Sequence, residues 1–350
     1  MRRSALAFIA CLVCVSTLLS QISVDVSLVT LVATVSDTSG RSVPNLDKSD
    51  FIVIEDGKEQ KVALVEKSQD LPLSIGILLD ASYSMQPKIQ TATIAIERFL
   101  KSLGKDDDVF LMTFAAKPKV EQNFTNDRNK ISKALHKIKL HNKTALYDTI
   151  EQGIEKIRDG KHEKKALLLV TDGQDTTSRI RLEQAMNDVR QSHVLLYCLG
   201  IGSNISSRRG PALPPVTAGR GGPPVIVLPG GIVIPVPGPL RQQFPSGGGR
   251  PPVIASPINN QDMANMSVLH ALASASGAKA WLVSTDFSSK SSMDDVLDEV
   301  AAELRGQYTI GYYPDHPVND NKWHQVVVRT KDSRYAVRSR KEYFGGRTTR

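Results

Sequence analysis

The stretch LSIGILLD, residues 73–80, decides the fold of this chain. It is almost wholly apolar between Pro72 and Asp80, which is typical of a strand buried on both faces of a parallel sheet. Similar apolar runs recur in DVFLMTFA, ALLLVTD, HVLLYCLGIG and AWLV, and segments with apolar residues at helical spacing lie between these runs. Strands that alternate with helices predict an α/β fold with a doubly wound, mostly parallel sheet over residues 71–304.

Short signals mark the ends of several of these elements. Asn126 or Asp127 is placed to cap a helix that carries Ile131, Leu135 and Ile138, and Gly277 is placed to end a later helix. The lone cysteine of this region, Cys198, lies within an apolar run and is expected to be a small buried hydrophobe.

Both ends of the chain read as β structure. Residues 22–66 are β-rich, with a hairpin expected around Asp56-Gly57, and residues 306–344 contain QYTIGYYP, KWHQVVVRT and YAVRSRKEYF. Because chain termini often lie close together, we expect one small antiparallel β module made from both ends.

Residues 205–257 interrupt the α/β pattern. They are rich in Pro, Gly, Val and Ile, and hold five arginines with no lysine or acidic residue. One interpretation is a disordered insertion. The other is a functional loop or partner-binding strand, because VIVLPGGIVIPV is too apolar for a plain linker and would suit a small hairpin. The net charge of +8 comes mainly from this segment, not from a patterned surface, so nucleic-acid binding is not expected.

The first twenty residues resemble an export signal. Arg2 and Arg3 precede an apolar run from Ala5 to Leu19, which is short for a membrane span. Cleavage after this region predicts a periplasmic, extracellular or cell-surface protein, and a retained N-terminal anchor is the alternative. No other stretch is expected to cross a bilayer.

Five oxygen-bearing side chains follow the predicted strands. Asp80, Ser82 and Ser84 form a D-x-S-x-S motif after the first buried strand, Asp172 ends the strand ALLLVTD, and Thr144 opens a helix. In a doubly wound sheet, ligands bind beyond the carboxyl ends of the strands, so these groups are expected to converge. Oxygen ligands suit a hard cation, Mg²⁺ above all, with Ca²⁺ or Mn²⁺ as alternatives.

Plainer interpretations of the same residues remain open. The serines would also serve as helix caps, and Asp172-Gly173 would also suit a simple turn. Asp148 and Asp175 are interpreted as supporting or surface groups. His141 and Lys143 belong either to a ligand-binding rim or to a solvated loop.

These motifs together resemble the von Willebrand factor type A family. DASYSM matches its D-x-S-x-S element, Thr144 its single threonine and TDG its third element. VSDTSGR, SDFIVIEDGKEQ and LRGQYTIGYYP further resemble a bacterial subfamily of secreted proteins related to this domain. The resemblance implies a metal-ion-dependent adhesion site. Ser82 and Ser84 would touch the metal directly, Asp80 and Asp172 largely through water, and Thr144 in either way.

The expected function is divalent-metal-dependent protein binding or adhesion without catalysis. A cation with few charged direct ligands accepts a carboxylate from an Asp or Glu of a protein partner. A phosphatase of the haloacid-dehalogenase type is a weaker alternative: Asp80, Thr144, Lys165, Asp172 and Asp175 follow its order, but Ser82 stands where that chemistry needs an acid. The third alternative is a scaffold with the same fold whose metal site is not essential.

Overall fold

The computed structural model describes residues 28–67, 71–202, 225–228, 232–235, 264–284 and 290–346. The chain divides into two compact units, unit 1 with residues Met1–Asp70 and Arg305–Arg350, and unit 2 with Leu71–Leu304. The expected export signal, residues 1–20, lies outside the described residues. Within the part that is described, no helix has both the length and the apolar character needed to cross a membrane.

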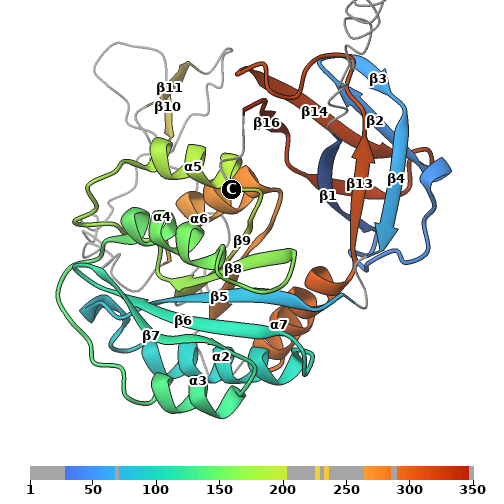
Figure 1. Cartoon of the computed structure of the whole chain (residues 1–350). Coiled ribbons are helices and arrows are strands. Elements are labelled where there is room, and N and C mark those ends of the chain that lie inside the picture. Colours follow the sequence, from blue (N-terminus) through green and yellow to red (C-terminus); the bar gives the residue numbers. More distant parts are fainter. Residues whose placement is uncertain are drawn as a thin grey trace, which may run out of the picture. The chain divides into compact units, whose positions relative to one another are not determined.

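Unit 2 is built on one six-stranded sheet (Figure 1). Its strand order is β12-β9-β8-β5-β6-β7, and all neighbours are parallel except β7, which pairs antiparallel with β6. This confirms the α/β fold with a mostly parallel sheet. The strands are β5 (Leu73–Asp80), β6 (Asp108–Phe114), β7 (Pro118–Thr125), β8 (Lys164–Thr171), β9 (Leu195–Gly202) and β12 (Ala280–Ser284).

Helices cover both faces of this sheet. One face carries α4 (Leu146–Ile157), α5 (Leu182–Gln191) and α6 (Met266–Ser276), and the other carries α2 (Ile89–Ser102), α3 (Arg128–Leu135) and α7 (Lys290–Arg305) (Figure 1). All eight residues of β5 are buried, as a central strand between two helical layers requires. The buried apolar cluster under α4, α5 and α6 includes Leu78, Ile150, Leu167, Val189 and Leu272.

Several local predictions are confirmed in unit 2. The Asp127 side chain accepts a hydrogen bond from the amide of Asn129 and caps α3. Gly277 ends α6 with a positive φ of 85°. Cys198 is buried in β9, and burial raises the pKa of its thiol. The helix α3 is shorter than expected, because it ends at Leu135 and leaves Ile138 in the following loop.

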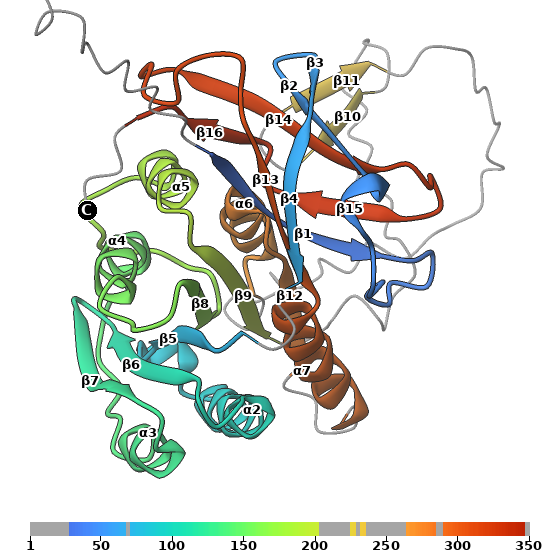
Figure 2. The ribbon, with the colours of Figure 1, turned by 45° about the vertical axis from the view of Figure 1, so that its right-hand side comes forward.

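Unit 1 consists of two four-stranded antiparallel sheets, with orders β15-β1-β13-β4 and β16-β14-β2-β3 (Figure 2). N-terminal and C-terminal strands pair in both sheets, since β1 pairs with β13 and β15, and β2 with β14. This confirms one β module made from both ends. Its elements are β1 (Val29–Ser36), the 3₁₀ turn η1 (Lys48–Asp50), β2 (Phe51–Glu55), β3 (Lys58–Gln60), β4 (Val62–Lys67), β13 (Gln307–Tyr312), β14 (Trp323–Thr330), β15 (Ala336–Ser339) and β16 (Glu342–Phe344).

Alternating side chains form the core of unit 1. In β14, every second residue is buried, and Val326 and Val328 join one apolar cluster with Leu31, Val53 and Ile310. This cluster contains residues from both sheets, as in packed antiparallel layers. The expected hairpin is present: Asp56 and Gly57 have φ of 46° and 83° and connect β2 to β3.

Only two short pieces of the segment 205–257 are described. Strands β10 (Val225–Leu228) and β11 (Ile232–Pro235) pair antiparallel. The rest of this segment lies outside the described residues, so both interpretations of the insertion stay open.

Candidate metal site

Asp80 ends β5 and is fully buried. Its Oδ1 accepts a hydrogen bond from the Ser82 amide at 2.9 Å, and its Oδ2 accepts one from the Thr171 hydroxyl at 2.6 Å. Thr171 ends the neighbouring strand β8, so the second bond joins the carboxyl ends of two parallel strands. Burial raises the pKa of Asp80 to about 6, although the hydrogen bonds from Ser82 and Thr171 act to lower it. A positive charge nearby would stabilise the ionised carboxylate.

Ser82 and Ser84 present their hydroxyl groups side by side. Their Oγ atoms are 2.9 Å apart, and Ser82 precedes the short 3₁₀ helix η2 (Tyr83–Met85). Ser82 occupies the N-cap position of this helix, but its side chain makes no capping hydrogen bond. The interpretation of Ser82 as a helix cap is therefore wrong. Its hydroxyl is turned toward Ser84, beside the Asp80 carboxylate.

Asp172 follows β8, and its carboxylate is paired with a lysine that the sequence analysis missed. The Lys88 ammonium donates a hydrogen bond to Asp172 Oδ2 at 3.2 Å, and both side chains are at most 2% exposed. A signal for Lys88 does exist in the sequence. It is the N-cap residue of α2, four and seven residues before Ala92 and Ala95 on the buried face of that helix, where an unpartnered charge would be costly.

The loop that carries Thr144 is hydrogen-bonded to both other parts of the site. On one side, the His141 amide donates to the Ala81 carbonyl at 2.9 Å, and the Tyr83 amide donates to the His141 carbonyl at 3.0 Å. On the other side, the Thr144 amide donates to the Thr176 hydroxyl at 2.8 Å. The structure therefore brings all five predicted residues to the carboxyl edge of the sheet, and Thr144 is buried there.

Asp148 and Asp175 hold the Asp172 loop against the start of α4. Asp175 Oδ1 accepts a hydrogen bond from the Leu146 amide at 2.8 Å. Asp148 accepts hydrogen bonds from the amide and Nε of Arg179, at 2.9 Å and 3.1 Å. Burial acts to raise the pKa of Asp148, but these bonds and the one from the Ile180 amide hold it below its usual value. Both aspartates are supporting groups.

A hollow of about 650 Å³ opens beside the site, and basic side chains dominate its rim. Ala81 and His141, which flank Ser82, contribute to its wall. The charged residues of the lining are Lys117, Lys119, Lys137 and Lys139, with Glu121 as the acidic one.

The five residues fit a divalent cation. Their donors are two carboxylates and three hydroxyl groups, which is the oxygen chemistry that Mg²⁺ and Ca²⁺ prefer. Lys88 neutralises part of the negative charge on Asp172, whereas Asp80 receives only neutral hydrogen-bond donors from Ser82 and Thr171. A cation beside Asp80 and the paired serine hydroxyls would supply the missing positive charge.

Residues 74–209 match the family model of the von Willebrand factor type A domain. Unit 2 has the fold of a type A domain. A relative from Synechocystis sp., named as the uncharacterized protein sll0103, is 26% identical over 160 residues. The match covers 42% of this chain and 37% of the relative, so it spans little more than a third of the relative's length.

Two solved structures resemble this chain in fold. The conserved hypothetical protein BatB from Bacteroides thetaiotaomicron is 16% identical, with a TM-score of 0.42, and the match covers 65% of this chain and 97% of BatB. A von Willebrand factor type A protein from Catenulispora acidiphila is 10% identical, with a TM-score of 0.45 and coverage of 91% and 71%. Likenesses at this level say nothing about what the type A domain of this chain binds.

Proposed function

We propose that the type A domain is a divalent-metal-dependent protein-binding module. In this proposal a cation, Mg²⁺ first and Ca²⁺ or Mn²⁺ in its place, binds through Asp80, Ser82, Ser84, Thr144 and Asp172. The bound ion offers an open coordination position to an Asp or Glu carboxylate of a partner. The observation that supports it best is the set of hydrogen bonds that ties three separate loops together and gathers these oxygen donors at one sheet edge.

The charge balance of the site favours an anionic partner. The paired hydroxyl groups of Ser82 and Ser84 are neutral donors, and the Lys88 ammonium already neutralises part of Asp172. A divalent cation held in this way keeps net positive charge on its open side. A partner carboxylate is the oxygen ligand that removes this charge.

The basic rim of the hollow adds to the same preference. The rim has four lysines and one acidic residue, Glu121, so its net charge is positive. An acidic surface around the partner carboxylate would be attracted to this rim. Exposed charges of this kind mainly raise the association rate and are screened by salt. We therefore expect faster association at low ionic strength, with the metal contact setting the orientation.

We propose further that this chain is an exported bacterial adhesion protein of the secreted subfamily. It would be located in the periplasm, outside the cell or at its surface. Its support is the sequence of residues 1–20 and the VSDTSGR, SDFIVIEDGKEQ and LRGQYTIGYYP motifs. We also propose that the domain is not catalytic. Ser82 lies two residues after Asp80, and a hydroxyl there cannot protonate a leaving group near neutral pH.

The test measures Mg²⁺ binding by calorimetry on the full chain and on two variants, Ser82→Ala and Asp172→Ala. Loss of groups that hold or orient a metal typically lowers its affinity by about 10- to 100-fold. Ser102→Ala, at the far end of α2, is the matched control and should bind Mg²⁺ like the unchanged chain. Equal Mg²⁺ affinity in all four proteins would refute the assignment of the site.

A phosphatase assay on the unchanged chain and on a further variant, Asp80→Asn, tests the alternative that the protein is an enzyme. Turnover of a generic phosphate ester that is lost in Asp80→Asn would replace the adhesion proposal by a phosphatase. Mg²⁺ binding without such turnover, combined with metal-dependent capture of a carboxylate-bearing partner, supports it.

A further inference from the structure

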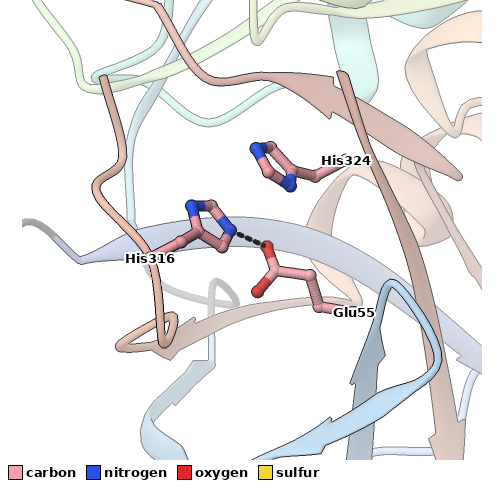
Figure 3. A group of neighbouring side chains, drawn as sticks. All are labelled: Glu55, His316 and His324. Carbon is pink, nitrogen blue, oxygen red and sulfur yellow. Dashed lines mark ion pairs between the residues drawn. The ribbon is translucent and has the colours of Figure 1, made fainter. Parts of the chain in front are cut away.

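A second group of side chains with metal-ligating chemistry lies in unit 1 and shares no residue with the type A site. Glu55 ends β2, His324 lies in β14, and His316 lies in the loop between β13 and β14. One ligand atom from each residue lies within 4.8 Å of the others. Figure 3 shows the His316 ring pointing at the Glu55 carboxylate, with the His324 ring beside them.

Glu55 is a buried carboxylate with one oxygen left unsatisfied. Its side chain is only 2% exposed, and its Oε1 accepts hydrogen bonds from the hydroxyl groups of Tyr312 and Tyr343. Its Oε2 is buried and has no hydrogen-bond partner. Buried polar atoms in native proteins are nearly always paired, so an orphaned carboxylate oxygen calls for a partner of its own.

Both histidines make a contact through Nδ1 of the kind that metal-binding histidines make. The Nδ1 of His316 is 3.0 Å from the Pro317 carbonyl oxygen, and the Nδ1 of His324 is 2.8 Å from Asp56 Oδ2. These contacts leave Nε2 of each ring toward the cluster. Metal-binding histidines are characteristically fixed in this way, with the other ring nitrogen donating to a carbonyl or a carboxylate.

Each Nε2 faces a carboxylate. The Nε2 of His316 is buried, lies 3.3 Å from Glu55 Oε1 and makes no hydrogen bond. The Nε2 of His324 is 3.1 Å and 3.2 Å from the two oxygens of Asp320. When Nδ1 alone carries the proton, these nitrogens present lone pairs to negative oxygens, and either a second proton or a metal cation between them makes the contact favourable.

We propose that Glu55, His316, His324 and Asp320 form a binding site for a divalent transition metal of the zinc class. Two imidazoles and two carboxylates supply four nitrogen and oxygen donors, which suits Zn²⁺ in tetrahedral coordination. Asp56 is a positioning residue that orients His324. The site joins β2, β14 and the loop before β14, so the bound ion stabilises unit 1.

Binding requires one ring to turn. The two imidazoles are stacked, with centroids 3.9 Å apart and planes 11° apart, and the lone pairs of parallel rings lie in separate planes. His316 is the ring that turns, because its side chain is 25% exposed, whereas that of His324 is 6% exposed and hydrogen-bonded at both nitrogens. The ion therefore replaces the stacked arrangement by a chelated one.

The probe is Co²⁺, added to the purified full chain in excess Mg²⁺ so that the type A site is occupied. Co²⁺ bound by nitrogen and oxygen donors in a tetrahedral site absorbs visible light, and Zn²⁺ should abolish this absorption by competition. We expect one equivalent of Co²⁺ to bind. Asp56→Asn should weaken binding about 10- to 100-fold, the usual cost of losing such a supporting carboxylate.

The variants keep the test decisive. His316→Gln changes a partly exposed side chain, and Asn suits the positive φ of 46° at position 56, so both variants are expected to fold even where Glu55→Gln does not. His136→Gln, 65% exposed in unit 2, is the matched control.

Absence of Co²⁺ absorption in the unchanged chain would overturn the proposal. So would binding that survives both His316→Gln and Asp56→Asn unchanged. Variants that alter only the pH dependence of unfolding, without metal binding, would identify a proton-bound histidine pair and overturn it as well. None of these results touches the type A site, because that site lies in unit 2.

Discussion

Lys88→Met tests whether the type A site is organised around a buried charge. The Lys88 ammonium lies 3.2 Å from Asp172 Oδ2, and its side chain is 2% exposed. Methionine keeps much of the length and apolar volume of lysine but removes the charge. Without Mg²⁺, the variant leaves Asp80 and Asp172 buried at one sheet edge with no lysine beside them. We expect unit 2 to lose stability in EDTA and to regain much of it in Mg²⁺.

The magnitude follows from the distance. Opposite unit charges 3.2 Å apart attract by about 5 kcal/mol at an effective dielectric constant near 20. Desolvation of the ammonium offsets part of this attraction in the unchanged protein. Breaking one partner of a buried pair typically costs about 3–5 kcal/mol, because the other charge stays buried. The double variant Lys88→Met/Asp172→Asn should recover most of the loss, since no unpaired charge remains at that position.

The two tryptophans of the chain allow unit 2 to be measured separately. Trp281 lies in β12 of unit 2, and Trp323 lies in β14 of unit 1. In a Trp323→Phe background, urea unfolding followed by tryptophan fluorescence reports unit 2 alone. Lys101→Met, an exposed position on α2, is the control and should change the free energy of unfolding by less than about 0.5 kcal/mol. If Lys88→Met lowers the free energy of unfolding in EDTA by less than about 1 kcal/mol, the interpretation of Lys88 and Asp172 as a desolvated ion pair is refuted.

Three further predictions concern the supports of the two units. The folded-state pKa of Asp148 is lowered, so its contribution to stability is present above its unfolded pKa of about 3.9 and is lost as pH falls through the folded value. Asp148→Asn should therefore weaken the fall in the free energy of urea unfolding at acid pH. An unchanged fall would contradict the role given to Asp148. Gly173→Ala should destabilise more than Gly57→Ala in thermal melts: both glycines have positive φ, which costs alanine about 1–2 kcal/mol, but only at Gly173 would the new Cβ lie 2.9 Å from the Asn265 carbonyl oxygen. Equal losses of stability in the two variants would mean that the backbone at Asn265 moves aside at little cost. Ending the chain before Trp323 removes the strand that pairs with β2, so residues Phe51–Glu55 should lose protection in hydrogen exchange, and retained protection would mean that β2 does not depend on β14.

The sheet of unit 2 could be predicted because its central strands are almost wholly apolar, and this composition indicates burial on both faces. LSIGILLD has no face that tolerates water, and all of its residues are buried in the structure. The edge strand β7 was not predicted. Its sequence PKVEQNFT mixes polar and apolar residues, and none of its positions is fully buried, so neither a run nor a clean alternation marks it.

The two proposed metal sites also differ in how far the sequence alone predicts them. The D-x-S-x-S motif is local, and the ends of neighbouring parallel strands bring Asp172 to it. The ion pair between Lys88 and Asp172 spans 84 residues, and the contact between His324 and Asp56 spans 268. Periodicity and motif spacing describe neighbours along the chain. They carry no information on which polar groups two distant turns will place together, so only the assembled fold shows these pairs.

The start of α6 bears on the proposed metal site. The chain leaves β9 at Gly202, and it returns through Asn265, whose amide donates to the Asp172 carbonyl at 2.7 Å. Gly173 makes room for this contact, since a Cβ there would be 2.9 Å from the Asn265 carbonyl oxygen. The N-cap residue of α6 is thus bonded to the backbone of a proposed metal ligand. This hydrogen bond ties the start of α6 to Asp172, whereas Asp80 is hydrogen-bonded to the Ser82 amide and the Thr171 hydroxyl, and Ser82 lies beside His141.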